Sequence, residues 1–154
     1  MKISSRGHYA LRAMADLATH EQERPRNLAS ISLLQGIPQF YLEQLMLKIR
    51  KAGLVHSVRG PHGGFLMAKK PSEVTIGDIL RAVEEPIYPA ECVESLESAT
   101  GCEKVEGCAT HIFYEKLARR IDETLDTVNL EELCLEAEGL QGLKALKHNY
   151  DFYI

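Results

Sequence analysis

Apolar residues recur at helical spacing along the first 20 positions of the chain. Five of them fall on one face of a helix: Ala10, Leu11, Met14, Leu17 and Ala18. A polar stretch, EQERPRN, follows and contains Pro25, which is typical of a loop. The pattern therefore predicts an amphipathic helix over residues 5–20, with its apolar face turned toward a core.

Two shorter helices are predicted on either side of Gly36-Ile37-Pro38. The first has an apolar residue at every third position from Leu28 and can be capped by Asn27. The second has its apolar positions at Leu42, Leu45 and Ile49 and is stopped at Gly53. Two short helices around a tight, glycine-containing turn are typical of a helix-turn-helix.

Two short segments with strand-forming residues come next, LVHSVRG and GGFLMAKK. They flank a glycine-rich tip, so they predict a β-hairpin. Thr75-Ile76-Gly77-Asp78 then has the pattern of a helix cap. A hairpin directly after the second helix makes the expected fold mainly α with a small β-wing, that is, a winged helix-turn-helix.

The second half of the chain begins with residues 86–110, where no period holds. A stripe of apolar residues then steps by three or four positions: Tyr114, Leu117, Ile121, Leu125 and Val128. A stripe this narrow favours a helix–helix seam, with the same helix of a second subunit or with the chain's own domain. We expect a DNA-binding domain at 1–85, a loop at 86–110, a long dimerisation helix and a short following helix at 111–138, and a tail at 139–154.

Charge also differs between the two halves of the chain. Residues 1–70 carry a net charge of +7, residues 71–154 carry −11, and the whole chain carries −4. A basic first half suits binding to a polyanion. No run of about 18 apolar residues and no signal-peptide pattern is present, so we expect a cytoplasmic protein with no membrane partner.

The second helix of a helix-turn-helix reads the major groove of double-stranded DNA, and its outward positions are the candidate contacts. The candidates near base edges and adjacent phosphates are Pro38, Gln39, Phe40, Tyr41, Glu43 and Gln44. Lys48 and Arg50 would add attraction to the phosphate backbone. At the wing tip, Arg59 and Gly60 are candidates for close approach to the minor groove.

The loop ECVESLESATGCEKVEGCATH contains three cysteines and a histidine, namely Cys92, Cys102, Cys108 and His111. Clustered cysteines in a cytoplasmic protein favour metal binding or redox chemistry over disulfides. No Cys-x-x-Cys pair is present, which disfavours structural zinc. Cys108 and His111 share one face of a helix start, so both can bind one metal; spacing alone leaves an iron–sulfur cluster and redox-active thiols open. Cys134 shares helical spacing with Leu130 and Leu133, which indicates a core position.

The segment YLEQLMLKIRKAGLVHSVRGPHGGFLMAKKPSEVTIGDILRAVEEP resembles the Rrf2 family of bacterial regulators, and the resemblance extends from Ser4 to about Val128. It implies a homodimeric winged-helix repressor or activator that binds imperfect palindromes in promoters. It also implies an iron–sulfur cluster, [2Fe–2S] before [4Fe–4S], on Cys92, Cys102, Cys108 and His111. In nitric-oxide-sensing members a side chain at the position of His8, from the partner subunit, is the fourth ligand instead. Phe40 stands where iron–sulfur-regulating members have a small polar residue.

We therefore expect a DNA-binding transcriptional regulator whose operator binding depends on the cluster, and not an enzyme. The signal could be iron–sulfur supply, redox state or nitric oxide. The alternative is a cluster-free regulator of the same family, controlled by thiol oxidation or by a protein partner.

Overall fold

The structure is a computed structural model that describes residues 3–20, 24–94 and 107–150, with side chains as far as residue 140. The helices are α1 (Ser5–Thr19), α2 (Leu28–Gln35), α3 (Gln39–Lys51), α4 (Ile76–Ala82), α6 (Ala109–Thr127) and α7 (Leu130–Tyr150). Short 3-10 turns η1 (Pro71–Glu73) and η2 (Glu91–Val93) flank α4. Strands β1 (Val55–Val58) and β2 (Gly64–Met67) form one antiparallel sheet. The fold is thus mainly helical with a small β-wing, as predicted.

The helix-turn-helix forms where the sequence signals place it. The Asn27 side chain accepts a hydrogen bond from the Ala29 amide at 2.8 Å and caps α2. Gly36 ends α2 with a left-handed backbone (φ 61°), a conformation that costs a residue with a Cβ more than it costs glycine. Pro38 then precedes the first residue of α3, where its missing amide hydrogen costs the helix nothing.

The wing pairs β1 with β2 from Val55 opposite Met67 to Val58 opposite Gly64. A further pair of backbone hydrogen bonds joins Phe65 to Arg26, both at 2.9 Å. These bonds bring Gly64 so close to Arg26 that a Cβ on Gly64 would overlap the Arg26 carbonyl. The glycine therefore lets the wing lie against the segment that leads into α2.

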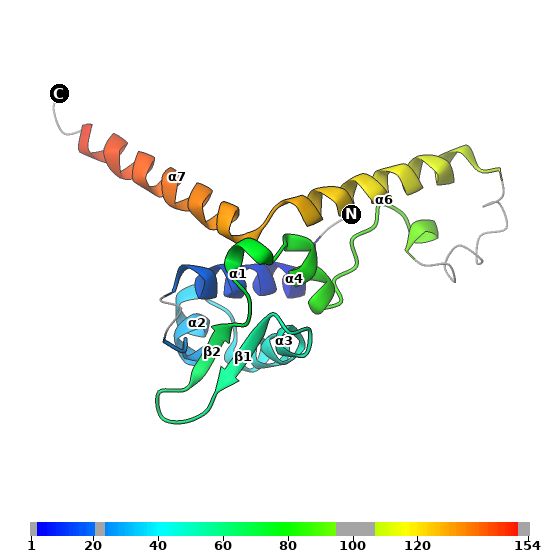
Figure 1. Ribbon diagram of the computed structural model, residues 1–154. Coiled ribbons are helices and arrows are strands. Elements are labelled where there is room, and N and C mark those ends of the chain that lie inside the picture. Colours follow the sequence, from blue (N-terminus) through cyan, green and yellow to red (C-terminus); the bar gives the residue numbers. More distant parts are fainter. Residues whose placement is uncertain (1–2, 21–23, 95–106, 151–154) are drawn as a thin grey trace.

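One core unites α1 with α2, α3, α4 and the start of α7, and α1 lies at its centre (Figure 1). The largest fully buried side chains are Met14, Ile31, Ile37, Leu42, Met46, Ile49, Val74, Ile79, Leu80, Val83 and Leu130. Leu42, Leu45 and Ile49 are buried as the spacing predicts. Burial of this many apolar side chains, at about 1.5–3 kcal/mol each, is the main force that holds the helices together.

The start of α4 is tied to the junction between α6 and α7. Thr75 and Asp78 form the predicted capping box, with bonds of 3.0 and 3.1 Å. The Ile76 amide donates to the Val128 carbonyl at 3.0 Å, and the Leu130 amide donates to the Val74 carbonyl at 2.8 Å. These two backbone bonds fix α6 and α7 to the DNA-binding domain at one point.

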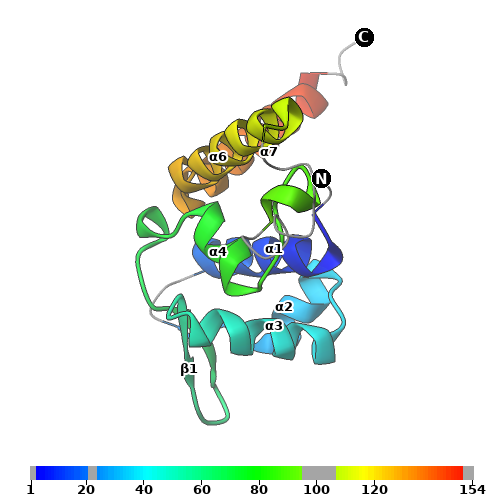
Figure 2. The same cartoon turned by 90° about the vertical axis from the view of Figure 1, so that its right-hand side faces the viewer.

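From that junction α6 and α7 diverge (Figure 1), and both lie on one side of the DNA-binding domain (Figure 2). No residue of α6 is buried, although its apolar stripe is continuous. Helix α7 continues through Gly139 to Tyr150, where the sequence analysis expected a short helix and then a separate tail. Leucine, glutamate, lysine and alanine are good helix formers, and no proline interrupts them. In the described part of the chain, no helix combines the length and the apolar character needed to cross a membrane.

Candidate DNA-reading surface and cluster loop

The outward face of α3 carries the predicted base-reading side chains in the open. Pro38, Gln39, Glu43 and Gln44 are exposed, and Phe40 is 76% exposed. The side-chain NH2 group of Gln39 donates to the Glu43 carboxylate at 3.3 Å, which turns the acidic side chain toward the start of the helix. A solvent-facing phenylalanine and two glutamines can contact thymine methyl groups and adenine edges respectively.

The two flanks of α3 contact other parts of the DNA-binding domain. On one flank the ring of Tyr41 meets the ring of Tyr9 on α1 edge to face, with centroids 5.8 Å apart. On the other flank the Arg50 guanidinium donates to the Ser57 hydroxyl on β1 at 3.2 Å. Tyr41 and Arg50 therefore fix α3 between α1 and the wing while remaining accessible from outside.

The wing tip and α3 lie at the end of the molecule opposite α6 and α7 (Figure 1). Arg59 is exposed at this tip. Gly60 has a φ of 117°, which only glycine adopts readily, and a Cβ built there meets no other atom within 4 Å. The arginine thus projects from a backbone turn that is narrow enough to approach a groove.

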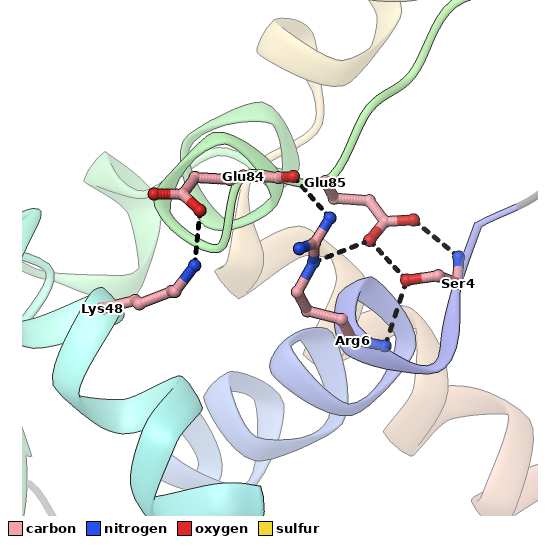
Figure 3. Close-up of polar contacts among 5 residues, drawn as sticks. All are labelled: Ser4, Arg6, Lys48, Glu84 and Glu85. Carbon is pink, nitrogen blue, oxygen red and sulfur yellow. Dashed lines mark hydrogen bonds and ion pairs between the residues drawn. The ribbon is translucent and has the colours of Figure 1, made fainter.

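A polar network joins the end of α4 to α1 and α3 (Figure 3). The carboxylate of Glu85 accepts hydrogen bonds from the amide and the hydroxyl of Ser4, both at 2.6 Å, and from Arg6 Nε at 3.4 Å. Arg6 also donates to the Glu84 carbonyl at 2.6 Å. The Lys48 ammonium on α3 lies 2.5 Å from the Glu84 carboxylate.

Glu85 is a charged side chain buried in this network, with only 1% of its surface exposed. Burial alone would raise the pKa of its carboxyl, but the hydrogen bonds from Ser4 and Arg6 outweigh burial and hold the pKa below its usual value. A Cβ on Gly7 would collide with this side chain, so the glycine makes room for it. Sequence reasoning missed the network; its one local signal is the acidic pair Glu84-Glu85 between an apolar helix and Pro86.

Three of the four predicted cluster ligands lie in described parts of the chain, and Cys102 lies outside them. Cys92 is in η2, which packs against α6. Cys108 is the N-cap of α6, and its sulfur lies 3.0 Å from the Thr110 hydroxyl. Within residues 3–20, 24–94 and 107–140, no three His, Cys, Asp or Glu side chains are grouped closely enough to hold a metal ion. The described residues thus pack η2 against α6, without a complete ligand set among them.

His111 has the features of a ligand held in place by its surroundings. Its side chain is only 14% exposed, and Nδ1 is buried with no hydrogen-bond partner among the described residues. The other ring nitrogen, Nε2, lies 3.6 Å from the Glu115 carboxylate one turn further along α6. A buried nitrogen without a partner is costly unless something absent from the described structure binds it. The rival ligand His8 is exposed on the first turn of α1.

Cys134 is separate from the loop cysteines. It packs against the core, with its sulfur 3.9 Å from the Ala15 carbonyl. Burial raises the pKa of its thiol, and the nearby Glu138 carboxylate raises it further. The predicted core role of Cys134 is confirmed, and a thiol with a raised pKa is a poor nucleophile at neutral pH.

Comparison with known families agrees with the helix-turn-helix, wing and long α6. Residues 3–136 match the model of the Rrf2 family, described as iron-dependent transcriptional regulators. The chain belongs to the Rrf2 family. It is therefore a DNA-binding transcriptional regulator, as the fold of its first half predicts.

Individual Rrf2 relatives support the same assignment. The chain is 45% identical over 141 residues to the HTH-type transcriptional regulator IscR of Aliivibrio salmonicida, covering 92% of this chain and 82% of the relative. Among solved structures, T. potens IscR superposes with a TM-score of 0.74 at 38% identity, covering 92% of this chain and 91% of the other. CymR, the global cysteine regulator of B. subtilis, superposes with a TM-score of 0.68 at 36% identity, covering 88% and 98%. These relatives are named as regulators, not as enzymes, which agrees with the sequence analysis.

Proposed function

We propose that this Rrf2 regulator binds operator DNA under the control of an iron–sulfur cluster held by Cys92, Cys102, Cys108 and His111. The observation that carries the proposal is the buried, unpartnered Nδ1 of His111 beside Cys108 at the start of α6. The similarity to regulators named IscR and to a family described as iron-dependent supports it. Because the target is promoter DNA, the proposed place of action is the cytoplasm.

The first component of the proposed function is DNA reading by α3 and the wing. Gln39, Phe40 and Gln44 are proposed to contact base edges, with Glu43 selecting for cytosine. Pro38, Tyr41 and Arg50 border the same surface and are proposed to face the adjacent DNA backbone. Arg59 and Gly60 are proposed to enter the minor groove beside it.

The second component is a homodimer formed along α6. Ile112 and Phe113 are 50% and 59% exposed, and Leu117 on the apolar stripe is 36% exposed. A 19-residue helix with a continuous apolar stripe and no buried residue needs a covering surface. A second copy of α6 supplies one by symmetry, and a two-fold axis presents two α3 helices to an imperfect palindrome.

The third component is the cluster, for which [2Fe–2S] is our first proposal and [4Fe–4S] the alternative. When bound, the cluster supplies a centre whose charge changes with redox state. Nδ1 of His111 is the proposed ligand atom, and the Glu115 carboxylate next to Nε2 can accept the ring N–H and fix its orientation. One imidazole in place of a thiolate lowers the negative charge of the ligand set, which raises the reduction potential.

The occupancy or redox state of the cluster is proposed to act on DNA binding through the loop that joins α4 to α6. The loop lies between the DNA-binding domain and the proposed dimer helix, so its shape affects the spacing and tilt of the two α3 helices. Iron–sulfur supply, redox state and nitric oxide are all signals to which such a centre can respond.

A cluster-free regulator is the second candidate, and the similarity to CymR, a cysteine regulator, favours it. In that case thiol oxidation or a protein partner would replace the cluster. Anaerobic purification separates the two candidates, because a cluster gives brown protein with stoichiometric iron and sulfide. Colourless protein without iron would refute the cluster, and equal operator affinity before and after cluster removal would refute its control of DNA binding.

The fourth ligand is tested with matched histidine variants. We expect His111→Ala to lose the spectroscopic signature of nitrogen ligation and His8→Ala to keep it. The reverse result would move the ligand to α1, and loss in neither variant would exclude both histidines.

A further inference from the structure

Lys48 was expected from the sequence to attract DNA phosphates, but the structure gives its charge a partner inside the protein. Its ammonium lies 2.5 Å from the Glu84 carboxylate (Figure 3). Lys48 is in the last turn of α3 and Glu84 follows the end of α4, 36 positions later in the chain. The contact therefore joins the DNA-reading helix to the segment that leaves the DNA-binding domain toward the cysteine loop.

The position of Lys48 around α3 agrees with an internal role. Seven residues make almost two helical turns, so Lys48 lies on the same flank as Tyr41. The Tyr41 ring contacts Tyr9 of α1, so this flank faces the body of the domain. Gln44, one turn earlier on the same side of α3, and Leu47 are more exposed than Lys48, so Lys48 lies at the edge of the outward face.

Glu84 is held firmly enough to position its partner. Its φ of 56° is left-handed, which a residue with a side chain adopts only where its surroundings enforce it. This conformation ends α4, because the Glu84 amide donates to the Arg81 carbonyl at 3.0 Å and the Glu85 amide donates to the Leu80 carbonyl at 2.9 Å. Arg6 on α1 adds a bond to the Glu84 carbonyl. The backbone of Glu84 is thus fixed to α1 and α4, and its carboxylate is bonded to Lys48 on α3.

An ion pair this exposed adds little to stability, since Lys48 and Glu84 keep 38% and 73% of their side-chain surface in solvent. Its effect is geometric, because base reading by α3 requires that the helix sits at one angle in the groove. We propose that Lys48 is a positioning residue for operator recognition, which acts through Glu84 on the angle of α3 and not through a DNA phosphate.

The two possible roles of Lys48, positioning α3 and binding a DNA phosphate, predict different effects of neutral substitutions on DNA affinity. If Lys48 positions α3, then Lys48→Gln and Glu84→Gln each weaken specific binding by a similar factor, of about 3- to 10-fold, and the double variant is no weaker than either single one. Affinity for unrelated DNA stays the same. If Lys48 binds a phosphate, Lys48→Gln weakens both kinds of binding and lowers the salt slope by about one contact, while Glu84→Gln does not weaken binding.

The experiment measures binding of the wild type and the three variants to two duplexes across a range of salt concentrations. One duplex is selected from a random pool by the wild-type protein, and the other is a scrambled duplex of the same length. All proteins are purified anaerobically and matched in iron and sulfide content, so the result does not depend on whether a cluster is present. Lys69→Gln controls for the loss of one exposed positive charge from the DNA-binding domain.

A charge exchange completes the test. The variant with both Lys48→Glu and Glu84→Lys restores the pair in the reverse sense, and we expect it to recover most of the specific affinity that Lys48→Glu alone loses. No recovery, additive losses in the neutral double variant, or unchanged specific binding in both single variants would each overturn the proposal.

Discussion

Glu85 is the buried charge on which the attachment of α1 to α4 depends, and Glu85→Gln tests that dependence. The substitution keeps the size of the side chain but replaces one of its two oxygens by an NH2 group, which cannot accept a hydrogen bond. The carboxylate accepts three bonds, two from Ser4 at 2.6 Å and one from Arg6 at 3.4 Å. At least one of these donors would face the new NH2 group and lose its partner.

The expected loss follows from the burial of the site. A hydrogen bond to a charged group contributes about 1.5–3 kcal/mol, and a buried donor left without a partner costs about 1–3 kcal/mol. Arg6 keeps 33% of its side chain exposed, so its share is reduced by solvent. We therefore expect Glu85→Gln to lower the free energy of unfolding by about 2–3 kcal/mol, mostly through Ser4.

The assay is urea unfolding at a fixed protein concentration, because dimerisation would otherwise change the apparent stability. Glu123→Gln is the matched control. Glu123 pairs with Arg120 on the surface of α6 at 2.8 Å, and its loss should cost less than about 1 kcal/mol. A loss for Glu85→Gln no larger than that of the control would refute the assigned role of the buried carboxylate.

The pH dependence gives an independent check of the same contact. The pKa of Glu85 is lowered in the folded protein from an ordinary value of 4.5, because the hydrogen bonds from Ser4 and Arg6 outweigh burial. Its contribution to stability is therefore complete above pH 4.5 and is lost as the pH falls through the folded pKa. The stability difference between the wild type and Glu85→Gln should shrink over that range, and a difference that stays constant would contradict the reasoning.

Four other substitutions test separate parts of the molecule. Arg59→Ala should weaken specific DNA binding and lower its salt slope by about one contact, and unchanged binding would remove Arg59 from the interface. Gly64→Ala should cost about 1–3 kcal/mol in urea unfolding, because its methyl group would overlap the Arg26 carbonyl. Gly139→Ala, in the open interior of α7, should instead stabilise the protein by up to about 1 kcal/mol. A Gly139→Ala variant that is less stable than Gly64→Ala would contradict this account. Ile121→Asp should convert a dimer to a monomer in analytical ultracentrifugation, and a persistent dimer would exclude α6 as the interface.

Most of the DNA-binding domain could be predicted because its signals are local. Asn27, Gly36 and the Thr75–Asp78 capping box each act within a few positions of the chain, and each has the role that the sequence indicates. The apolar spacing of α1 and α3 is equally local. Such signals identify where helices start, stop and bury a face.

The polar network could not be predicted, because its partners are far apart in sequence. Glu85 and Ser4 are 81 positions apart, and Lys48 and Glu84 are 36 apart. Nothing in the sequence near Lys48 distinguishes a lysine bonded to a carboxylate from one that faces DNA. The continuation of α7 past Gly139 was missed for a different reason, since a single glycine lowers helix stability without ending a helix.

The proposed cluster ligands are only partly described by the structure. The family resemblance predicts Cys92, Cys102, Cys108 and His111 as ligands, and the structure adds the buried Nδ1 of His111 and the carboxylate of Glu115 next to Nε2. Cys102 lies outside the described residues, so the four proposed ligands stay a prediction.

Helix α4 is one element through which a change in α6 can reach α3 within one subunit, because it contacts both helices. The Ile76 amide at the start of α4 bonds to the Val128 carbonyl, and Arg81 in the last turn of α4 lies 2.5 Å from Asp126 on α6. Just after this last turn, Glu84 contacts α3 through Lys48. Packed helices shift as units and deform little, so a change in the direction of α6 either moves α4 or breaks these contacts. On the proposed mechanism, the segment between α4 and α6 alters the angle of α3 without touching DNA, and the Lys48–Glu84 pair is the contact where that effect would be measured.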